Sequence, residues 1–167
     1  MYCNGSTWVS NEPSVSVTPA FGAYNFIGKT LTSSESLIEL YSKNYDLTNS
    51  VRLYNDELLP SRFIVPEKGI YHFDFYAKLN MINFTPSSDT RITIAIAQST
   101  FNGSVNYHTY FPVYNNDNSK SIAITRTLAL MAGDKICITV KVSSPPSGGG
   151  IIKLVDIGLE GHLVARN

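Results

Sequence analysis

The chain has 167 residues and a mass of 18.4 kDa, which is the size of one domain. Thirteen basic residues balance thirteen acidic ones, so the chain lacks the basic excess of nucleic-acid binders and polybasic membrane-surface proteins. Apolar residues make up 43%, too many for a disordered protein, yet no stretch approaches the ~18 consecutive apolar residues of a membrane span. We therefore expect a folded domain that binds no nucleic acid and inserts into no membrane.

The N-terminus is expected to be an arm ahead of the domain. Residues 1–19 contain two prolines and few apolar side chains, so we place an N-terminal arm or linker at 1–18 and the domain at 19–167. The first twenty residues lack the basic start and apolar run of a signal peptide. Cys3 falls in this arm and Cys137 in a predicted strand, and this distance favours two unpaired thiols over a disulfide bridge.

Helical signals are weak along the chain. The best window is 33–41, where Leu37, Ile38 and Tyr41 are spaced as on one helix face, and we expect one turn there at most.

Alternation with a period of two predicts strands at 70–77, 91–96, 122–125 and 135–142. In the first of these, Tyr71, Phe73 and Phe75 share one face, and His72, Asp74 and Tyr76 share the other. Turn-forming residues separate the predicted strands, as at 66–69, 86–89, 115–118, 133–134 and 145–150. Many short strands between such turns predict an all-β protein, either a sandwich, a jelly roll or a barrel.

No motif for enzyme chemistry is present. His72, His108 and His162 are far apart in sequence, and neither a His-x-His metal pair, an HExxH zinc motif nor a G-x-S-x-G nucleophile elbow occurs. Gly22 and Gly28-Lys29-Thr30 resemble a phosphate loop, but their spacing is one residue too long. We therefore predict a protein that is not an enzyme, with no catalytic residues.

Calcium is the one cofactor for which the sequence offers a candidate site. The run Asn115–Asn118 could hold Ca²⁺ through side-chain oxygens, but it contains a single carboxylate, and a plain turn is favoured.

Four segments together resemble the globular head of complement component 1q. Residues 62–73 fit its F-x-x-P-x-x-G-x-Y-x-F signature, and residues 128–136 resemble its L-x-L-x-x-G-D-x-V segment. Residues 159–163 are similar to the closing F-x-G-x-L strand, with Leu159 for Phe, and residues 20–23 are similar to the opening A-F-S-A strand. The order and spacing of the four also fit, and the resemblance spans about residues 19–164.

The resemblance implies a ten-strand jelly roll, similar to tumour necrosis factor, that forms homotrimers and recognises partners through loops and side faces. The residues fit a trimer, because a strand that points Ile122, Ile124, Leu128 and Leu130 inward shows only small side chains outward. Such a face would let three subunits approach closely at a threefold axis. We predict a trimer interface formed by His72, Asp74, Tyr76, Ala123, Thr125, Thr127 and Ala129.

Recognition is expected in the loops, since strands build the scaffold of a sandwich. Aromatic and amide side chains suit sugars, because rings cover the apolar sugar face and amides bind hydroxyls. We predict a ligand site at Phe101, Tyr114, Asn116 and Asp117, although the same residues could simply make turns.

The biological setting is inferred from the N-terminus. The family's collagen-like stalk is missing, and residues 2–9 instead resemble the short "CNG-x-x-W" pieces of bacterial surface and phage-fibre polypeptides. We expect an extracellular recognition head, on a cell surface or virion, that binds a surface glycan or protein. Two alternatives stay open, a structural trimerisation subunit and a jelly-roll enzyme that acts on polysaccharide through Tyr and His.

Overall fold

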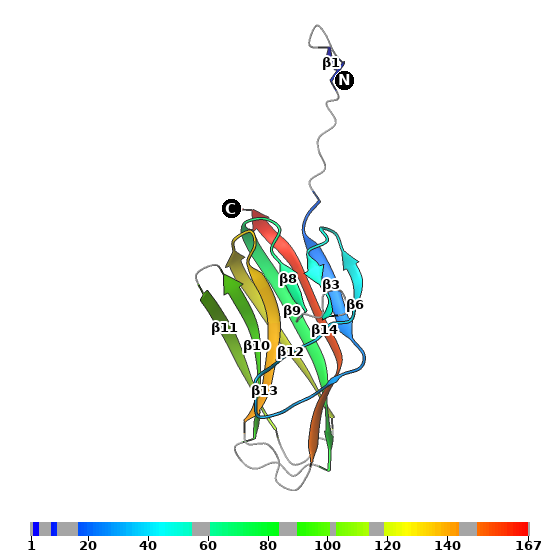
Figure 1. The fold of residues 1–167 in the computed structure, drawn as a ribbon, viewed down its shortest axis with the longest axis vertical. Coiled ribbons are helices and arrows are strands. Elements are labelled where there is room, and N and C mark those ends of the chain that lie inside the picture. The colour runs from blue at the N-terminus through cyan, green and yellow to red at the C-terminus, as the bar shows by residue number, and fades with distance from the viewer. Residues whose placement is uncertain are drawn as a thin grey trace.

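Two antiparallel sheets pack face to face and run along the long axis of the domain (Figure 1). The computed structural model describes residues 2–3, 8–9, 17–54, 61–83, 90–100, 103–113, 119–143 and 150–166. Within these residues no helix is long and apolar enough to cross a membrane.

The first sheet, here called the β9 sheet, has the order β12-β9-β14-β3-β6, and a short strand, β4, pairs with β14. Its strands are β3 (Ala20–Asn25), β4 (Lys29–Thr30), β6 (Ser42–Asp46), β9 (Gly69–Ile82), β12 (Ser119–Leu130) and β14 (Ile151–Arg166).

The second sheet, here called the β10 sheet, has the order β11-β10-β13-β8-β7, and β5 pairs with β13. Its strands are β5 (Ser36–Leu37), β7 (Val51–Arg52), β8 (Arg62–Ile64), β10 (Arg91–Thr100), β11 (Gly103–Pro112) and β13 (Lys135–Ser143). A separate pair, β1 (Tyr2–Cys3) and β2 (Trp8–Val9), lies near the N-terminus of the chain.

The four predicted strands are present, and the alternation of β9, β12 and β13 is confirmed, whereas β10 is buried on both faces from Ile92 to Gln98. Strand β9 buries every second residue from Tyr71 to Met81, and β13 buries Ile136, Ile138, Val140 and Val142. The all-β architecture fits a jelly-roll sandwich. The sheets contain six strands each rather than ten in all, because the described residues include short strands such as β4, β5 and β7.

The helical turn expected at 33–41 is wrong. Residues Ser36 and Leu37 form β5, and the amide of Ile38 then donates to the carbonyl of Ile138 at 2.8 Å. The apolar residues of this window serve the core of the sandwich, where Ile38 and Leu40 are buried. Packing against β13 therefore overrides a helical spacing that extends over only five residues.

The two ends of the sandwich differ in what they carry. Val17–Pro19 enters beside the C-terminal strand, where the amide of Leu163 donates to the carbonyl of Pro19 at 2.9 Å. We call this the arm end. At the opposite, far end, Ile82 pairs with Ile151 and Arg91 pairs with both Pro112 and Ser143 (Figure 1).

Aromatic rings fill the core near the arm end. Phe21 and Phe63 stack with ring centres 4.6 Å apart, and Phe63 also contacts Tyr71 and Phe73 at 5.7 and 5.9 Å. Gly161 on β14 lies against these rings, because a Cβ atom there would come within 2.5 Å of Phe21 and 2.8 Å of Phe73. The close approach of rings and backbone therefore requires glycine at this position.

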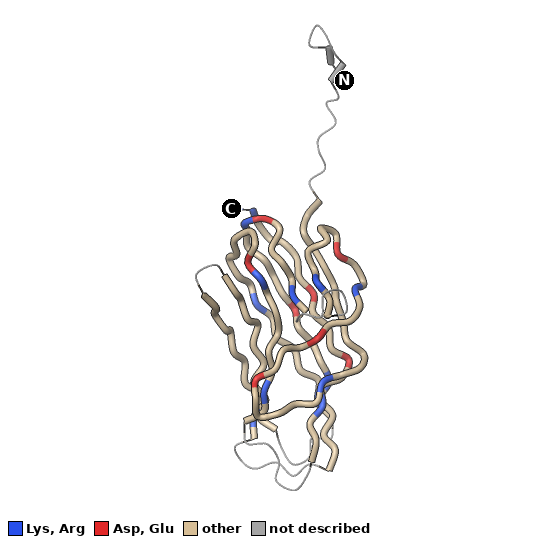
Figure 2. Tube along the Cα trace, in the orientation of Figure 1, with Lys and Arg blue, Asp and Glu red and all other residues tan. Residues whose placement is uncertain are grey.

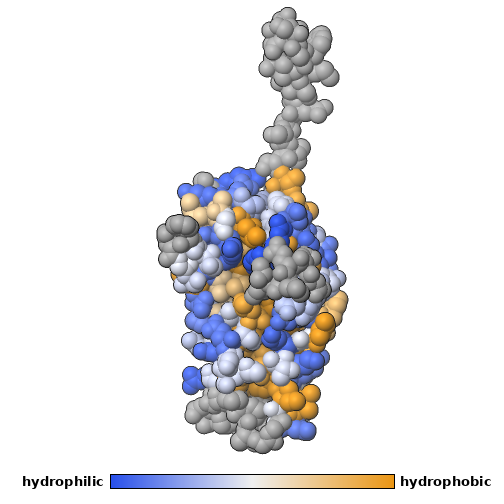
Figure 3. Space-filling view, viewed as in Figure 1, coloured by the Kyte–Doolittle hydropathy of each residue, from blue (hydrophilic) through white to orange (hydrophobic). Residues whose placement is uncertain are grey.

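Charged residues of both signs are interspersed over the two sheets (Figure 2). In one view of the surface, apolar residues gather in patches between hydrophilic ones (Figure 3). Cys137 is a free thiol on β13, half-buried, and burial together with the charge of Glu35 raises its pKa. The other cysteine, Cys3, lies in β1, and its side chain is outside the described residues.

The glycine beneath the aromatic cluster gives a stability prediction. Gly161→Ala should lower the free energy of unfolding by roughly 1–3 kcal/mol, because the added methyl group displaces buried rings. The matched control is Gly22→Ala, whose new Cβ would contact the ring of Tyr45, an exposed side chain that can move aside. Urea unfolding measures both, and equal losses in the two variants would contradict the packing argument.

Candidate functional site

The outward face of the β9 sheet brings the predicted interface residues together. Strand β9 turns His72, Asp74 and Tyr76 away from the core, while the residues between them are buried. On β12, the exposed residues alternate with buried Ile122, Ile124, Leu128 and Leu130. The sequence therefore predicted the outward faces of both strands correctly.

The register of the two strands aligns these residues in rows. Ala123 lies opposite Tyr76, Thr125 opposite Asp74, and Thr127 opposite His72. Ala129 follows one step further and lies opposite Ile70. All seven predicted residues therefore lie on one continuous surface.

Hydrogen bonds link two of the rows. The Thr125 hydroxyl donates to Asp74 Oδ1 at 2.9 Å, and Thr127 Oγ1 lies 2.9 Å from His72 Nδ1. His72 Nε2 also lies 3.4 Å from Asp74 Oδ2. The short threonine side chains thus orient the longer polar groups of the neighbouring strand.

Strand β14 extends the rows with residues that sequence reasoning did not assign to the site. His162 lies opposite His72, Glu160 opposite Asp74, and Gly158 opposite Tyr76. The rings of His72 and His162 have their centres 5.4 Å apart. Sequence alternation could not place these residues outward, because a β-bulge interrupts it. The register between β14 and β9 shifts between Val155 and Gly158, and Asp156 within this bulge has a left-handed φ of 50°.

Two tyrosine rings approach glycines of the adjacent strands closely. The ring of Tyr76 occupies the place of a side chain at Gly158, and the ring of Tyr45 does the same at Gly22. Burial raises the pKa of Tyr45, and the negative charge of Glu160 and the neighbouring Tyr76 raise it further. Tyr45, Tyr76 and Glu160 therefore form one interacting group on the outward face.

A shallow cavity of about 370 Å³ lies on the same face. Its lining includes Tyr76 and Lys78 from β9, Ser121 and Ala123 from β12, and Asp156 from the bulge of β14. The cavity exists because the β12 side chains are small while the tyrosine beside them is large.

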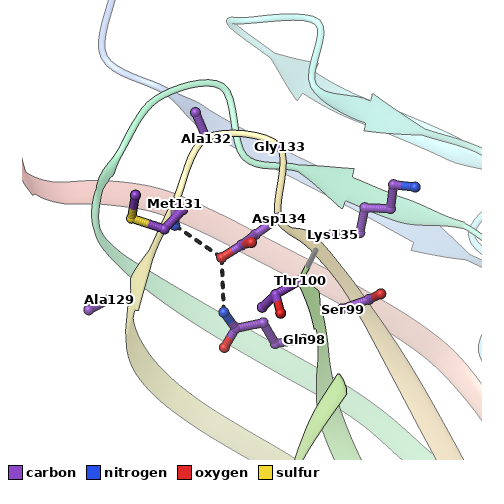
Figure 4. Close-up of a pocket in the computed structure, with 9 residues that line it drawn as sticks. All are labelled: Gln98, Ser99, Thr100, Ala129, Met131, Ala132, Gly133, Asp134 and Lys135. Carbon is purple, nitrogen blue, oxygen red and sulfur yellow. Dashed lines mark hydrogen bonds between the residues drawn. The ribbon is translucent and has the colours of Figure 1, made fainter. Parts of the chain in front are cut away.

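A second cavity, of about 690 Å³, lies at the turn between β12 and β13 (Figure 4). Here Asp134 is buried, and its Oδ2 accepts hydrogen bonds from the Met131 amide at 3.0 Å and from Gln98 Nε2 at 2.9 Å. The side-chain oxygen Oε1 of Gln98 in turn accepts a hydrogen bond from the Tyr107 hydroxyl at 3.2 Å. Gly133 has a φ of 89°, so the turn that the sequence predicted at Gly133-Asp134 is present.

The hydrogen bonds of Asp134 serve the structure of the turn. Its carboxylate holds the hairpin closed and ties it to β10 and β11. The residues that line this cavity include no histidine, tyrosine or arginine, so the convergent pocket that a polysaccharide-acting enzyme would need is not found there.

The predicted ligand residues Phe101, Tyr114, Asn116 and Asp117 lie outside the described residues, as does the candidate calcium run 115–118. Their described neighbours are nevertheless informative. Thr100 and Gly103 flank Phe101 at the arm end, whereas Val113 and Ser119 flank 114–118 at the far end (Figure 1). Strand β11 separates these two pairs of flanking residues by ten residues, roughly 33 Å.

No family model matches this sequence, and no curated protein matches it. Among solved structures, the chain is similar to the globular domain of zebrafish complement 1qA protein, with a TM-score of 0.63 and 17% sequence identity. The match covers 89% of this chain and 99% of that one. The likeness supports the complement 1q-type jelly-roll fold expected from the sequence motifs.

The tyrosine group on the outward face gives a pH prediction. Because the pKa of Tyr45 is raised on folding, its protonated form contributes stability that is complete below the pKa of an unfolded tyrosine, about 10. This contribution is lost as the pH rises through the higher pKa of the folded state. Glu160→Gln should lower the pKa of Tyr45. The titration of Tyr45 is followed by tyrosinate absorbance, after subtracting the titration of a matching protein that carries Tyr45→Phe. An unchanged Tyr45 titration in Glu160→Gln would contradict the pairing.

Proposed function

We propose that this chain is a non-enzymatic recognition head that works as a homotrimer on an extracellular fibre or surface protein. The observation that carries the proposal is the outward face of β12, which presents the small side chains of Ser119, Ser121, Ala123, Thr125, Thr127 and Ala129 beside the polar row of β9. A merely solvated strand would more often carry lysine or glutamate there.

Exposed apolar residues on the same sheet support a protein contact. Tyr45, Tyr76, Ile82 and Ile151 all lie on the outward face, and each is between 41% and 52% exposed. Ile82 and Ile151 are also direct cross-strand partners. Covering such side chains with two further copies of the chain removes apolar area from water.

A trimer is the assembly that the family resemblance implies, and small side chains suit the close approach of three chains at an axis. We therefore place His72, Asp74, Tyr76, Ala123, Thr125, Thr127 and Ala129 at or beside the contact between subunits.

The ends of the sandwich support a role as a tip. The N-terminal segment joins at the arm end, and the residues that flank 84–89, 114–118 and 144–149 lie at the far end (Figure 1). A head attached through its arm would then direct the far end away from the protein that bears it. We propose that Tyr114, Asn116 and Asp117 bind a surface glycan or protein.

The trimer is tested by its mass in solution. The wild type should scatter light as a particle of three times 18.4 kDa, and Ala123→Arg or Ala129→Arg should dissociate it, because each buries an unpaired charge at a close contact. Ser104→Arg, an exposed position on β11 of the other sheet, is the matched control and should remain trimeric. A wild-type monomer at micromolar concentration would overturn the trimer.

Ligand recognition is tested separately on a glycan array and on cells. The triple variant Tyr114→Ala, Asn116→Ala and Asp117→Ala should lose binding while keeping its mass and melting temperature. A trimer repeats a weak site three times, which can raise the apparent affinity by ~10²–10⁴, so a dissociated Ala123→Arg variant should also bind much more weakly. Phe101→Ala is measured as a separate variant.

Two results would contradict the recognition head. If the triple variant bound as well as the wild type, the site would lie elsewhere. A stable wild-type trimer that binds neither glycans nor cells would instead favour a purely structural assembly subunit.

A further inference from the structure

Four side chains of metal-ligand type form a square on the outward face of the β9–β14 pair. His72 and Asp74 come from β9, and His162 and Glu160 lie directly opposite them on β14. All four are at least partly exposed. The remaining histidine of the chain, His108, lies on β11 of the other sheet.

The distance between the two histidine rings is close to the distance between two imidazoles that bind one metal ion. Imidazole nitrogens bind Zn²⁺ at about 2.0–2.1 Å, so two rings on one tetrahedral ion have their centres roughly 5 Å apart. The centres of His72 and His162 are 5.4 Å apart. Two rings at this separation can share one ion when each points a nitrogen at it.

The spacing of Asp74 matches as well. Two donor atoms on one tetrahedral ion at those bond lengths lie about 3.3 Å from each other. His72 Nε2 and Asp74 Oδ2 are 3.4 Å apart, long for a hydrogen bond but suitable for neighbouring ligands. The Asp74 carboxylate is also held in place by the Thr125 hydroxyl.

Thr127 supplies the partner that a ligating histidine needs. Its Oγ1 lies 2.9 Å from His72 Nδ1, where it can accept the Nδ1–H. In that tautomer the lone pair is on Nε2, which faces Asp74. A hydrogen bond to the distal ring nitrogen is the usual way in which a protein orients a metal-binding histidine.

Among the residues that the structure describes, no three His, Cys, Asp or Glu side chains are already arranged to hold a metal ion. We propose that His72 and Asp74 in their present positions, joined by His162 after rotation of its exposed ring, bind a divalent transition-metal cation such as Zn²⁺. Imidazole ligands favour such ions over Ca²⁺ and Mg²⁺, and water completes the coordination. All the ligands belong to one chain, so the site does not depend on the proposed trimer.

The test uses untagged protein stripped of metal with a chelator. Titration with Zn²⁺ in a calorimeter, and with Co²⁺ followed by its visible absorption, should show one ion per chain. His72→Ala and His162→Ala should each weaken binding by more than about tenfold, since even a supporting partner is worth 10–100-fold at metal sites. His108→Ala, the matched control, should bind as the wild type does.

Further variants separate ligands from supporting residues. Asp74→Asn should weaken binding and alter the Co²⁺ spectrum, because a carboxylate ligand is lost. Thr127→Val should weaken binding by roughly 10-fold or more while leaving the spectrum unchanged, because it removes only the partner of Nδ1. Circular dichroism of each metal-free variant shows whether the fold is kept.

Binding that is absent in the wild type, or unchanged in both His72→Ala and His162→Ala, would overturn the site. Light scattering on the same samples keeps this result apart from the proposed function. A monomer that binds Zn²⁺ refutes the trimer alone, whereas a trimer that binds no Zn²⁺ refutes the metal site alone.

Discussion

The alternation of β9 is the constraint on which the rest of the structure depends. This strand pairs with β12 along one edge and with β14 along the other, so both neighbours take their register from it. Its inward residues Tyr71 and Phe73 pack against aromatic rings from β3 and β8, and Phe75 is buried as well. Because inward and outward positions alternate strictly, burying this aromatic row also determines which polar residues face outward.

The outward face of the β9 sheet combines three kinds of residue that seldom share a solvated strand surface. Small side chains line β12, ligand-type groups occupy the middle rows, and tyrosine rings lie over glycines toward β3. Each kind depends on its neighbour: the rings of Tyr76 and Tyr45 can occupy these places only because Gly158 and Gly22 have no side chain. Threonines of β12 are short enough to hydrogen-bond His72 and Asp74 without covering them. Hydrogen bonds within a single chain therefore already order part of this surface, which suits the proposed contact with another copy.

The sequence was sufficient wherever period two is unbroken. The faces of β9, β12 and β13, and the turn closed by Asp134, followed directly from the alternation and from Gly133-Asp134. It was insufficient where a single residue breaks the period. In β14 the outward residues are Lys153 and Val155 before the bulge but Gly158, Glu160 and His162 after it, so a constant alternation misassigns the last part of the strand. The pairing of His72 with His162 could not be predicted from local sequence, because 90 residues separate them and only the pairing of β9 with β14 brings them together.

The placement of the arm has a mechanical consequence. Strands β3 and β14 pair over six residues, from Ala20 with His162 to Asn25 with Ile157, and they run along the long axis between the arm end and the far end (Figure 1). When a head is held at its far end and pulled through its N-terminal arm, the force acts along these strands and not across them. The backbone hydrogen bonds of the pair are then loaded together in shear, and many must break at once before β3 can slide. The same bonds would open one after another if the load peeled the strand from its end. In the proposed recognition head, this direction of attachment lets an ordinary antiparallel pair resist tension between the bearing protein and the bound partner.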